Sequence, residues 1–245
     1  MRVGLIADIH GNLVALDAVL AELERAGVDR LICLGDIAAL GPRPQAVVRR
    51  LRALDVPCVL GNTDAWNIDL GLLARESTSP VVQECVRWST AQLATDDLDW
   101  LREFPMTRRI ELGAGHALLV FHGSPHSNNA VLAATTPGEE LDALFAGEAA
   151  MLLAGGHTHV QMLRRHGRFR LLNPGSVGLP GTGPGTPGLP VNEHVCWAEF
   201  AMIDTARGLS FDLRRLPLEP DALRASIAGS GMPHPEWWLA RWQLE

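Results

Sequence analysis

Short apolar runs alternate with amphipathic stretches over the first sixty residues. Arg2–Ala7, Leu31–Leu34 and Cys58–Leu60 are apolar runs of the length of a strand. Between them, Asn12–Arg25 carries leucine and valine at helical spacing, and Pro44–Leu54 has a proline near the start of a second helical pattern. Continuous apolar strands that alternate with helices are typical of a parallel sheet covered on both faces.

The pattern changes twice after this region. Residues 65–105 look helical, and from residue 107 onward strand patterns dominate. These later strands are predicted at Thr107–Leu112, His116–Phe121, Met151–Ala154, Gln161–Arg165, Phe169–Leu172, Val195–Ile203 and Leu209–Arg215, with a hairpin turn at 167–168. We therefore predict an α/β fold, a four-layer α/β/β/α sandwich of two mixed sheets flanked by helices, formed by residues 1–245 as a single domain.

Two segments depart from this pattern. Pro174–Pro190 is rich in proline and glycine, so it is predicted to be a long loop, either a lid over a site or simply mobile. Residues 217–245 are predicted to be a helical tail, in which Trp237, Trp238 and Trp242 lie at helical spacing. Such a tail is expected to dock on the core, and the alternative is a contact between subunits in a homo-oligomer.

Composition narrows the class of protein. The chain has 245 residues, 47% of them hydrophobic, and a net charge of −7 without any lysine. An acidic chain offers no broad electrostatic surface to a long nucleic acid. No apolar run is long enough to span a membrane, and the N-terminus does not resemble a signal peptide, so we expect a cytoplasmic protein. The four cysteines form no CxxC pair, and Cys33 and Cys58, which lie in apolar runs, are expected to be packed thiols.

A polar side chain able to bind metal follows each of several apolar runs. In chain order these residues are Asp8, His10, Asp36, Asn62, His122, His157 and His159. Because parallel strands end at one edge of a sheet, we expect the side chains to meet there. Two aspartates, four histidines and an asparagine suit two divalent transition ions. If Asp36 bridges them, each ion has four protein ligands and room for water and substrate.

The motifs around these residues resemble those of the calcineurin-like metallophosphoesterases. The matches cover about residues 1–180 and are AD-x-H-GN (7–12), LGD (34–36), GN-x-D (61–64), FHG (121–123), GGHTH (155–159) and NPGS (173–176). The last three are especially similar to the small bacterial and archaeal phosphodiesterase branch.

The resemblance implies a ligand for each position and a reaction. One ion would take Asp8, His10, Asp36 and His159, and the other would take Asp36, Asn62, His122 and His157. Manganese is the first expectation, with iron, zinc or nickel as alternatives. A hydroxide bridging the ions would attack the phosphorus of a small phosphodiester. Phosphomonoesters or dinucleoside polyphosphates are the alternative substrates, and a metal-binding scaffold with weak catalysis is the alternative of another class.

The sequence departs from the family at Thr63, where many members have a histidine that protonates the leaving group. His126 is a candidate substitute, with an ordinary solvated loop histidine as the alternative. Asp64 is expected either to orient the Asn62 loop or to cap a turn. Asn12 is expected to cap a helix or to contact phosphate. Candidate phosphate clamps are Arg43 and Arg164, although surface charge is the usual role of such arginines.

Overall fold

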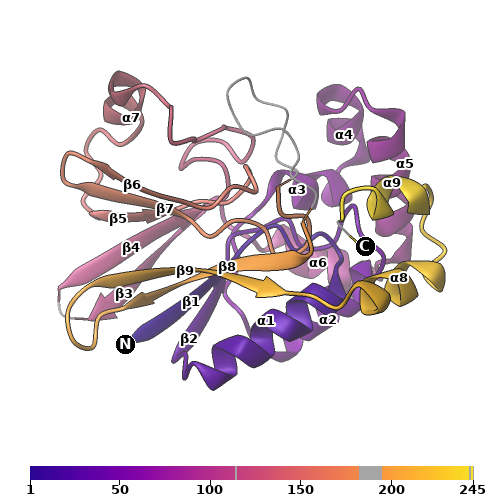
Figure 1. Cartoon of the computed structure of the whole chain (residues 1–245). Coiled ribbons are helices and arrows are strands. Elements are labelled where there is room, and N and C mark those ends of the chain that lie inside the picture. The colour runs from indigo at the N-terminus through magenta and orange to yellow at the C-terminus, as the bar shows by residue number, and fades with distance from the viewer. Residues whose placement is uncertain (114, 182–194, 243, 245) are drawn as a thin grey trace.

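Two mixed β-sheets form the centre of the molecule in the computed structural model, which describes residues 1–113, 115–181, 195–242 and 244 (Figure 1). The first sheet has the strand order β2-β1-β8-β9, and the second has the order β3-β4-β5-β7-β6. The strands are β1 (Arg2–Ile6), β2 (Arg30–Cys33), β3 (Thr107–Gly113), β4 (His116–Phe121), β5 (Leu152–Ala154), β6 (Met162–His166), β7 (Phe169–Asn173), β8 (Trp197–Asp204) and β9 (Ser210–Pro217).

Each sheet contains both parallel and antiparallel pairs of strands. β1 pairs in parallel with β2 and antiparallel with β8, so that Arg2 lies opposite Asp204. In the second sheet β5 pairs in parallel with both β4 and β7. The carboxyl ends of β1, β2, β4 and β5 are therefore the places where side chains from two sheets can meet.

Helices cover both outer faces, which confirms the predicted four-layer sandwich. They are α1 (Leu13–Arg25), α2 (Pro44–Ala53), α3 (Asn62–Ile68), α4 (Leu70–Glu76), α5 (Pro80–Gln92), α6 (Thr95–Arg102), α7 (Gly138–Leu144), α8 (Pro220–Ala228) and α9 (Pro235–Leu239). Leu16 of α1 packs in one core with Ile6 and Phe200, on the outer face of the first sheet. Leu141 of α7 packs with Phe121 on the outer face of the second. Helix α7 was not predicted from the sequence.

A separate apolar core fills the space between the sheets. Leu5 and Ala201 of the first sheet pack there with Leu118, Leu152 and Leu172 of the second. These side chains alternate along their strands with those of the outer cores, as the two-residue period of a strand requires. The two sheets are therefore held face to face by apolar burial.

The predicted strand Cys58–Leu60 is wrong as a strand. Only Cys58 forms a bridge to Cys33, where the Cys33 N–H donates to Pro57 O at 3.0 Å and the Val59 N–H donates to Cys33 O at 3.1 Å. The Leu60 N–H then donates to Pro105 O at 2.9 Å. The pairing with β2 therefore ends after one bridge, and the chain turns at Gly61, the N-cap of α3.

The tail docks on the core as predicted. Trp238 and Trp242, 0% and 4% exposed, belong to the same core as α1. Of the proline-rich loop, 182–190 lie outside the described residues, so the lid prediction stays a prediction for that part. In the part of the chain that the structure describes, no helix is both long enough and apolar enough to cross a membrane.

Candidate metal centre

The seven predicted ligand side chains come together at one place, between the ends of the two sheets. All of them are buried. Asp8 and His10 follow β1, Asp36 follows β2, Asn62 begins α3, His122 follows β4, and His157 and His159 follow β5. The strand ends therefore position the cluster in the way that the apolar runs predict.

Asp36 lies between two groups of these side chains. Its Oδ2 is 3.7 Å from His10 Nε2, and its Oδ1 is 3.5 Å from His122 Nε2. On the first side, His159 Nε2 is 3.0 Å from His10 Nε2 and 3.3 Å from Asp8 Oδ1. Asp8, His10 and His159 form one group with the spacing of a metal site, and Asp8, Asp36 and His122 form a second.

Asn62 joins two histidines on the other side of Asp36. Its Oδ1 is 3.1 Å from His122 Nε2 and 3.0 Å from His157 Nδ1. One amide oxygen therefore faces two imidazole nitrogens, and a carbonyl oxygen of this kind can bind a divalent cation.

Backbone carbonyls orient three of the imidazole rings. The Nδ1 atoms of His10, His122 and His159 contact the carbonyl oxygens of Ala39 at 3.1 Å, Leu34 at 2.7 Å and Leu179 at 2.8 Å. A carbonyl can only accept, so in each ring Nδ1 carries the proton and the Nε2 lone pair of the neutral form points into the cluster. His10 and His159 thus direct lone pairs at each other across 3.0 Å, which requires a proton or a cation between them. Because these lone pairs face one another, the set of donor atoms is suited to metal ions.

The charges of the cluster perturb the pKa values of its members. Burial, followed by the charge of His159, lowers the pKa of His10 to about 4, and burial with the charge of His122 lowers that of His157 to about 4. Burial would also lower the pKa of His122, but the Asp36 carboxylate outweighs it and raises that pKa to about 10. A cation that takes this place must displace the proton of His122, so metal affinity should rise with pH.

Most of these side chains belong to residues whose backbone conformation is strained. Five of the seven have a positive φ, a conformation that costs a non-glycine residue on the order of 1 kcal/mol or more. They are Asp8 (54°), His10 (48°), Asp36 (58°), His157 (68°) and His159 (57°). At Gly61 any Cβ would collide with Asp36 Oδ1, so glycine is required where the two loops cross.

Asp64 ties these loops together. Its carboxylate accepts hydrogen bonds from the backbone N–H groups of Asp36 at 2.8 Å, Ile37 at 2.9 Å and Gly61 at 3.0 Å. Both predicted roles therefore hold, because the Gly61 contact caps α3 while the other two fix the Asp36 turn. Asn12 caps α1 through a hydrogen bond from the Ala15 N–H at 3.1 Å, and its Nδ2 donates to Gly178 O at 3.2 Å.

Residues 174–181 support Asp8 from the other side. The Ser176 hydroxyl donates to Asp8 O at 2.7 Å, the Val177 N–H donates to Ala7 O at 3.0 Å, and the Gly178 N–H donates to Asp8 O at 3.0 Å. This half of the loop is a buried strap under the cluster, a role that sequence reasoning missed. The NPGS motif was the signal that could have located it.

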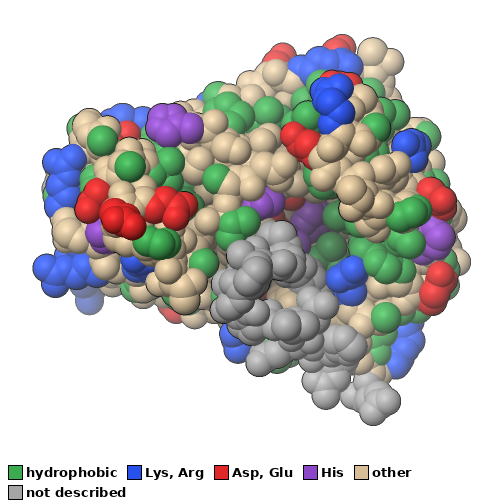
Figure 2. All heavy atoms as spheres, turned by 90° about the horizontal axis from the view of Figure 1, so that it is seen from above, with side chains coloured by type: hydrophobic (Ala, Val, Ile, Leu, Met, Phe, Trp, Pro, Cys, Tyr) green, Lys and Arg blue, Asp and Glu red, His purple; other side chains and the backbone are tan. Residues whose placement is uncertain are grey.

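A cavity of about 500 Å³ opens onto the cluster, and Figure 2 shows histidine side chains at the bottom of a hollow in this face. It is lined by five of the seven residues (His10, Asp36, Asn62, His157 and His159) and, among others, by Thr63 and Arg241. Arg43, Arg164 and His126 are not among its lining residues, and Arg164 instead donates to Ala133 O at 3.1 Å. The predicted phosphate clamps therefore do not face this cavity, whereas Arg241, which sequence reasoning missed, does.

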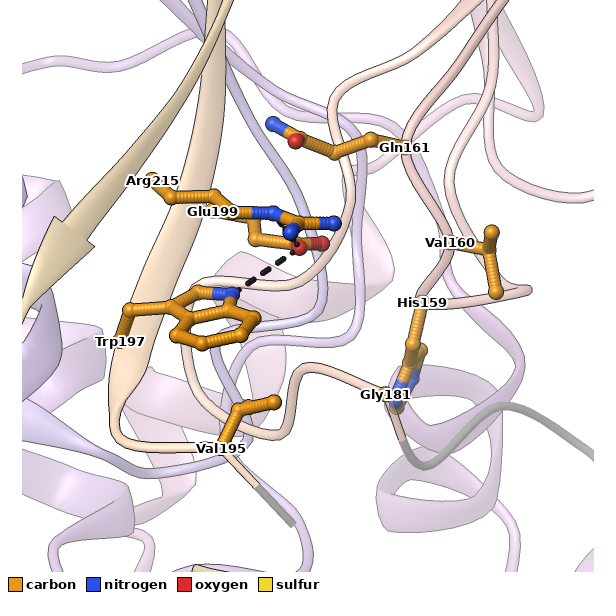
Figure 3. Close-up of a pocket in the computed structure, with 8 residues that line it drawn as sticks. All are labelled: His159, Val160, Gln161, Gly181, Val195, Trp197, Glu199 and Arg215. Atoms are coloured by element: carbon orange, nitrogen blue, oxygen red, sulfur yellow. Dashed lines mark hydrogen bonds and ion pairs between the residues drawn. The ribbon is translucent and has the colours of Figure 1, made fainter. Parts of the chain in front are cut away.

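A smaller pocket of about 80 Å³ borders the other side of His159 (Figure 3). Glu199 on its wall is 4% exposed and accepts hydrogen bonds from Trp197 Nε1 at 3.1 Å and Arg215 Nε at 3.0 Å. Burial raises the pKa of Glu199. Arg215 is thus already paired with a carboxylate, and this pocket offers a phosphate less positive charge than the larger cavity does.

Manganese is expected to stabilise the protein. Two carboxylates and four imidazoles packed within a few ångströms are stabilised by a cation. An ion present at 100 times its Kd adds about 2.7 kcal/mol to the free energy of unfolding. For a chain of this length the melting temperature should rise by roughly 5–10 °C, more at pH 8 than at pH 6. Differential scanning calorimetry of chelator-treated protein with and without manganese measures this shift. A His166→Gln variant, altered outside the cluster, should show the same rise, and an unchanged melting temperature at saturating manganese would contradict the metal centre.

Comparison with known proteins gives a result that is consistent with the geometry of this cluster. Residues 1–189 match the calcineurin-like phosphoesterase superfamily domain. The chain is 28% identical over 204 residues to phosphodiesterase YfcE of Escherichia coli, covering 79% of this chain and 89% of YfcE. It is 28% identical over 199 residues to the uncharacterized protein MJ0912 of Methanocaldococcus jannaschii, covering 74% and 78%. A metallophosphoesterase structure from Sphaerobacter thermophilus aligns with a TM-score of 0.74 and 27% identity over 98% of both chains.

Proposed function

Because the chain belongs to the calcineurin-like phosphoesterase superfamily, we propose that it is a metal-dependent phosphoesterase acting on small phosphodiesters. The observation that carries the proposal is the 3.0 Å approach of the Nε2 atoms of His10 and His159 inside a buried cluster with two carboxylates. The printed name of YfcE, a phosphodiesterase, supports the choice of diesters.

The proposed ligands are the seven predicted residues. Asp8, His10, Asp36 and His159 would hold one ion, and Asp36, Asn62, His122 and His157 would hold the other. The position of Asp36, with one oxygen toward His10 and the other toward His122, supports its role as the shared ligand. Two bound cations neutralise phosphate oxygens and lower the pKa of water, which is the chemistry that this reaction needs.

Thr63 shapes the expected substrate preference. Its hydroxyl oxygen is buried at the cavity and has no hydrogen-bond partner among the described residues, and its N–H donates to Asp36 Oδ1 at 2.9 Å. A threonine hydroxyl does not release a proton to a leaving group near neutral pH. The proposed enzyme should therefore favour esters whose leaving group departs without protonation.

The first test compares bis-p-nitrophenyl phosphate with p-nitrophenyl phosphate. Protein stripped with a chelator should be inactive, and added manganese should restore hydrolysis of the diester above that of the monoester. Preference for the monoester would replace the diesterase proposal by a phosphatase. If neither substrate is hydrolysed while two ions are bound, the alternative of a binding scaffold is favoured, because the ligands would then serve structure alone.

We propose further that residues 1–245 act as a single domain. The antiparallel pairing of β1 with β8, and the position of Trp238 and Trp242 in the core of α1, support this. The residues that follow the family match thus belong to the same folded unit as the proposed ligands.

A further inference from the structure

Arg241 lines the cavity of the proposed ligands and forms no ion pair with a carboxylate of the described residues. The carbon at the centre of its guanidinium group lies 4.0 Å from the centroid of the Trp237 ring. Its Nε is buried and has no hydrogen-bond partner in the part of the chain that the structure describes. Burial lowers the pKa of Arg241, and no carboxylate of the described residues offsets this effect. A partly desolvated guanidinium of this kind is costly until an anion pairs with it.

The position of Arg241 is fixed by the core beneath it. Trp238 and Trp242 on either side are almost fully buried, and their ring centroids are 5.4 Å apart. The Trp237 ring packs against one face of the guanidinium group, as in other cation–π pairs. The cation is therefore in place before a ligand arrives, and little ordering entropy is lost on binding.

The cavity has room for a second anionic group beside a phosphate at the proposed ions. Within the described part of the chain, Arg241 forms no hydrogen bond with any of the seven ligand side chains, although it lines the same cavity. At about 500 Å³ the cavity is larger than one phosphate group needs. Guanidinium groups bind phosphate through two parallel hydrogen bonds, and the chain is otherwise acidic, with a net charge of −7.

We propose that Arg241, stacked on Trp237, binds a second phosphate of the substrate, so that the preferred substrates carry one phosphate besides the group that is hydrolysed. The inference rests on the proposed function. Arg241 lies beyond residue 189, where the family match ends, so the family alone does not supply this cation. Substrate selection would then depend on the C-terminal tail.

Binding to manganese-loaded protein tests the proposal. Adenosine 5′-monophosphate is compared by titration calorimetry with adenosine 3′,5′-bisphosphate and adenosine 5′-diphosphate, which place the second phosphate at two different positions. The unaltered protein should bind at least one of the two roughly 10- to 100-fold more tightly than the monophosphate, the range of a charge-assisted hydrogen bond. Arg241→Gln should reduce this preference to about twofold or less, and Arg241→Lys should keep part of it because it keeps the charge.

The matched control is Arg168→Gln. Arg168 also stacks on an aromatic ring, with its guanidinium 5.0 Å from the Phe169 centroid, but it does not line the cavity. This variant removes the same charge and should keep the full preference. Melting temperatures of all variants show that they are folded.

Three results would overturn the proposal. They are no preference for either compound in the unaltered protein, an unchanged preference in Arg241→Gln, and an equal loss of affinity for all three compounds, which would place Arg241 on the hydrolysed phosphate. Hydrolysis of bis-p-nitrophenyl phosphate by the unaltered protein is followed separately. If hydrolysis is absent while Arg241→Gln still loses the preference, the proposed function fails and the anion site stands.

Discussion

Replacing Asp36 by asparagine is expected to reduce manganese-dependent hydrolysis of bis-p-nitrophenyl phosphate by roughly 10³-fold or more. Asp36 is the side chain that faces both halves of the cluster, at 3.7 Å from His10 and 3.5 Å from His122. Asparagine keeps an oxygen that can accept the Thr63 N–H, so the fold should remain. What it removes is the negative charge between two proposed cations. Steady-state kcat/KM with added manganese measures the loss, and circular dichroism checks the fold.

Asp142→Asn is the matched control. Asp142 is an exposed carboxylate that pairs with His166 at 2.7 Å, away from the cluster. The same change of charge should leave kcat/KM within about twofold, as expected for a surface substitution. If Asp36→Asn retained more than a tenth of the activity while still folded, Asp36 could not be the shared ligand.

Replacing Asp64 by alanine is expected to lower both stability and metal affinity. Three buried N–H groups, of Asp36, Ile37 and Gly61, would lose their acceptor. Each unsatisfied buried donor costs about 1–3 kcal/mol, so the free energy of unfolding should fall by about 3 kcal/mol or more. The Asp36 turn would also loosen, and loss of such an outer contact weakens metal binding roughly 10- to 100-fold. Urea unfolding of metal-free protein and titration with manganese measure the two effects.

Asp97 offers a comparison at an equivalent position of another helix. It is buried at the third position of α6 as Asp64 is at the third position of α3. It accepts hydrogen bonds from the Ala94 N–H at 3.1 Å and from Arg52 at 2.7 Å. Asp97→Ala should also lower stability but leave manganese affinity unchanged. Equal metal affinity in both variants would mean that Asp64 supports only the fold.

The sequence was sufficient for much of the fold because its strands and helices have regular periods. The run Arg2–Ala7 and the helical spacing in Asn12–Arg25 predict β1 and α1 to within one residue at each end. The side chains that follow apolar runs were predicted to meet, and all seven do. The carboxyl ends of β1, β2, β4 and β5 deliver six of them, and Asn62 arrives at the start of α3.

The parts that could not be predicted depend on contacts between distant segments. Nothing local shows that the Asp64 carboxylate reaches the Asp36 loop, or that Ser176 supports Asp8. In the sequence Arg241 is one more arginine of the kind usually found on the surface. In the structure the burial of Trp238 and Trp242 places it beside the cavity. Cys58–Leu60 has the composition of a strand, but only Cys58 bridges to β2 before the chain turns at Gly61 into α3.

The pairing of β1 with β8 also bears on how the chain folds. The second neighbour of β1 is β8, which pairs with it so that Arg2 lies opposite Asp204. β8 comes some two hundred residues later in the chain, so β1 lacks this neighbour until β8 has docked. His10 and His159 are 149 positions apart. Contacts between such distant segments must overcome a large loop-closure entropy and are made slowly. We expect the ligand set to be assembled late, so that an ion met early by the unfolded chain would find only fragments of it, such as the His157–His159 pair. Refolding before the metal is supplied should therefore avoid one source of kinetic trapping.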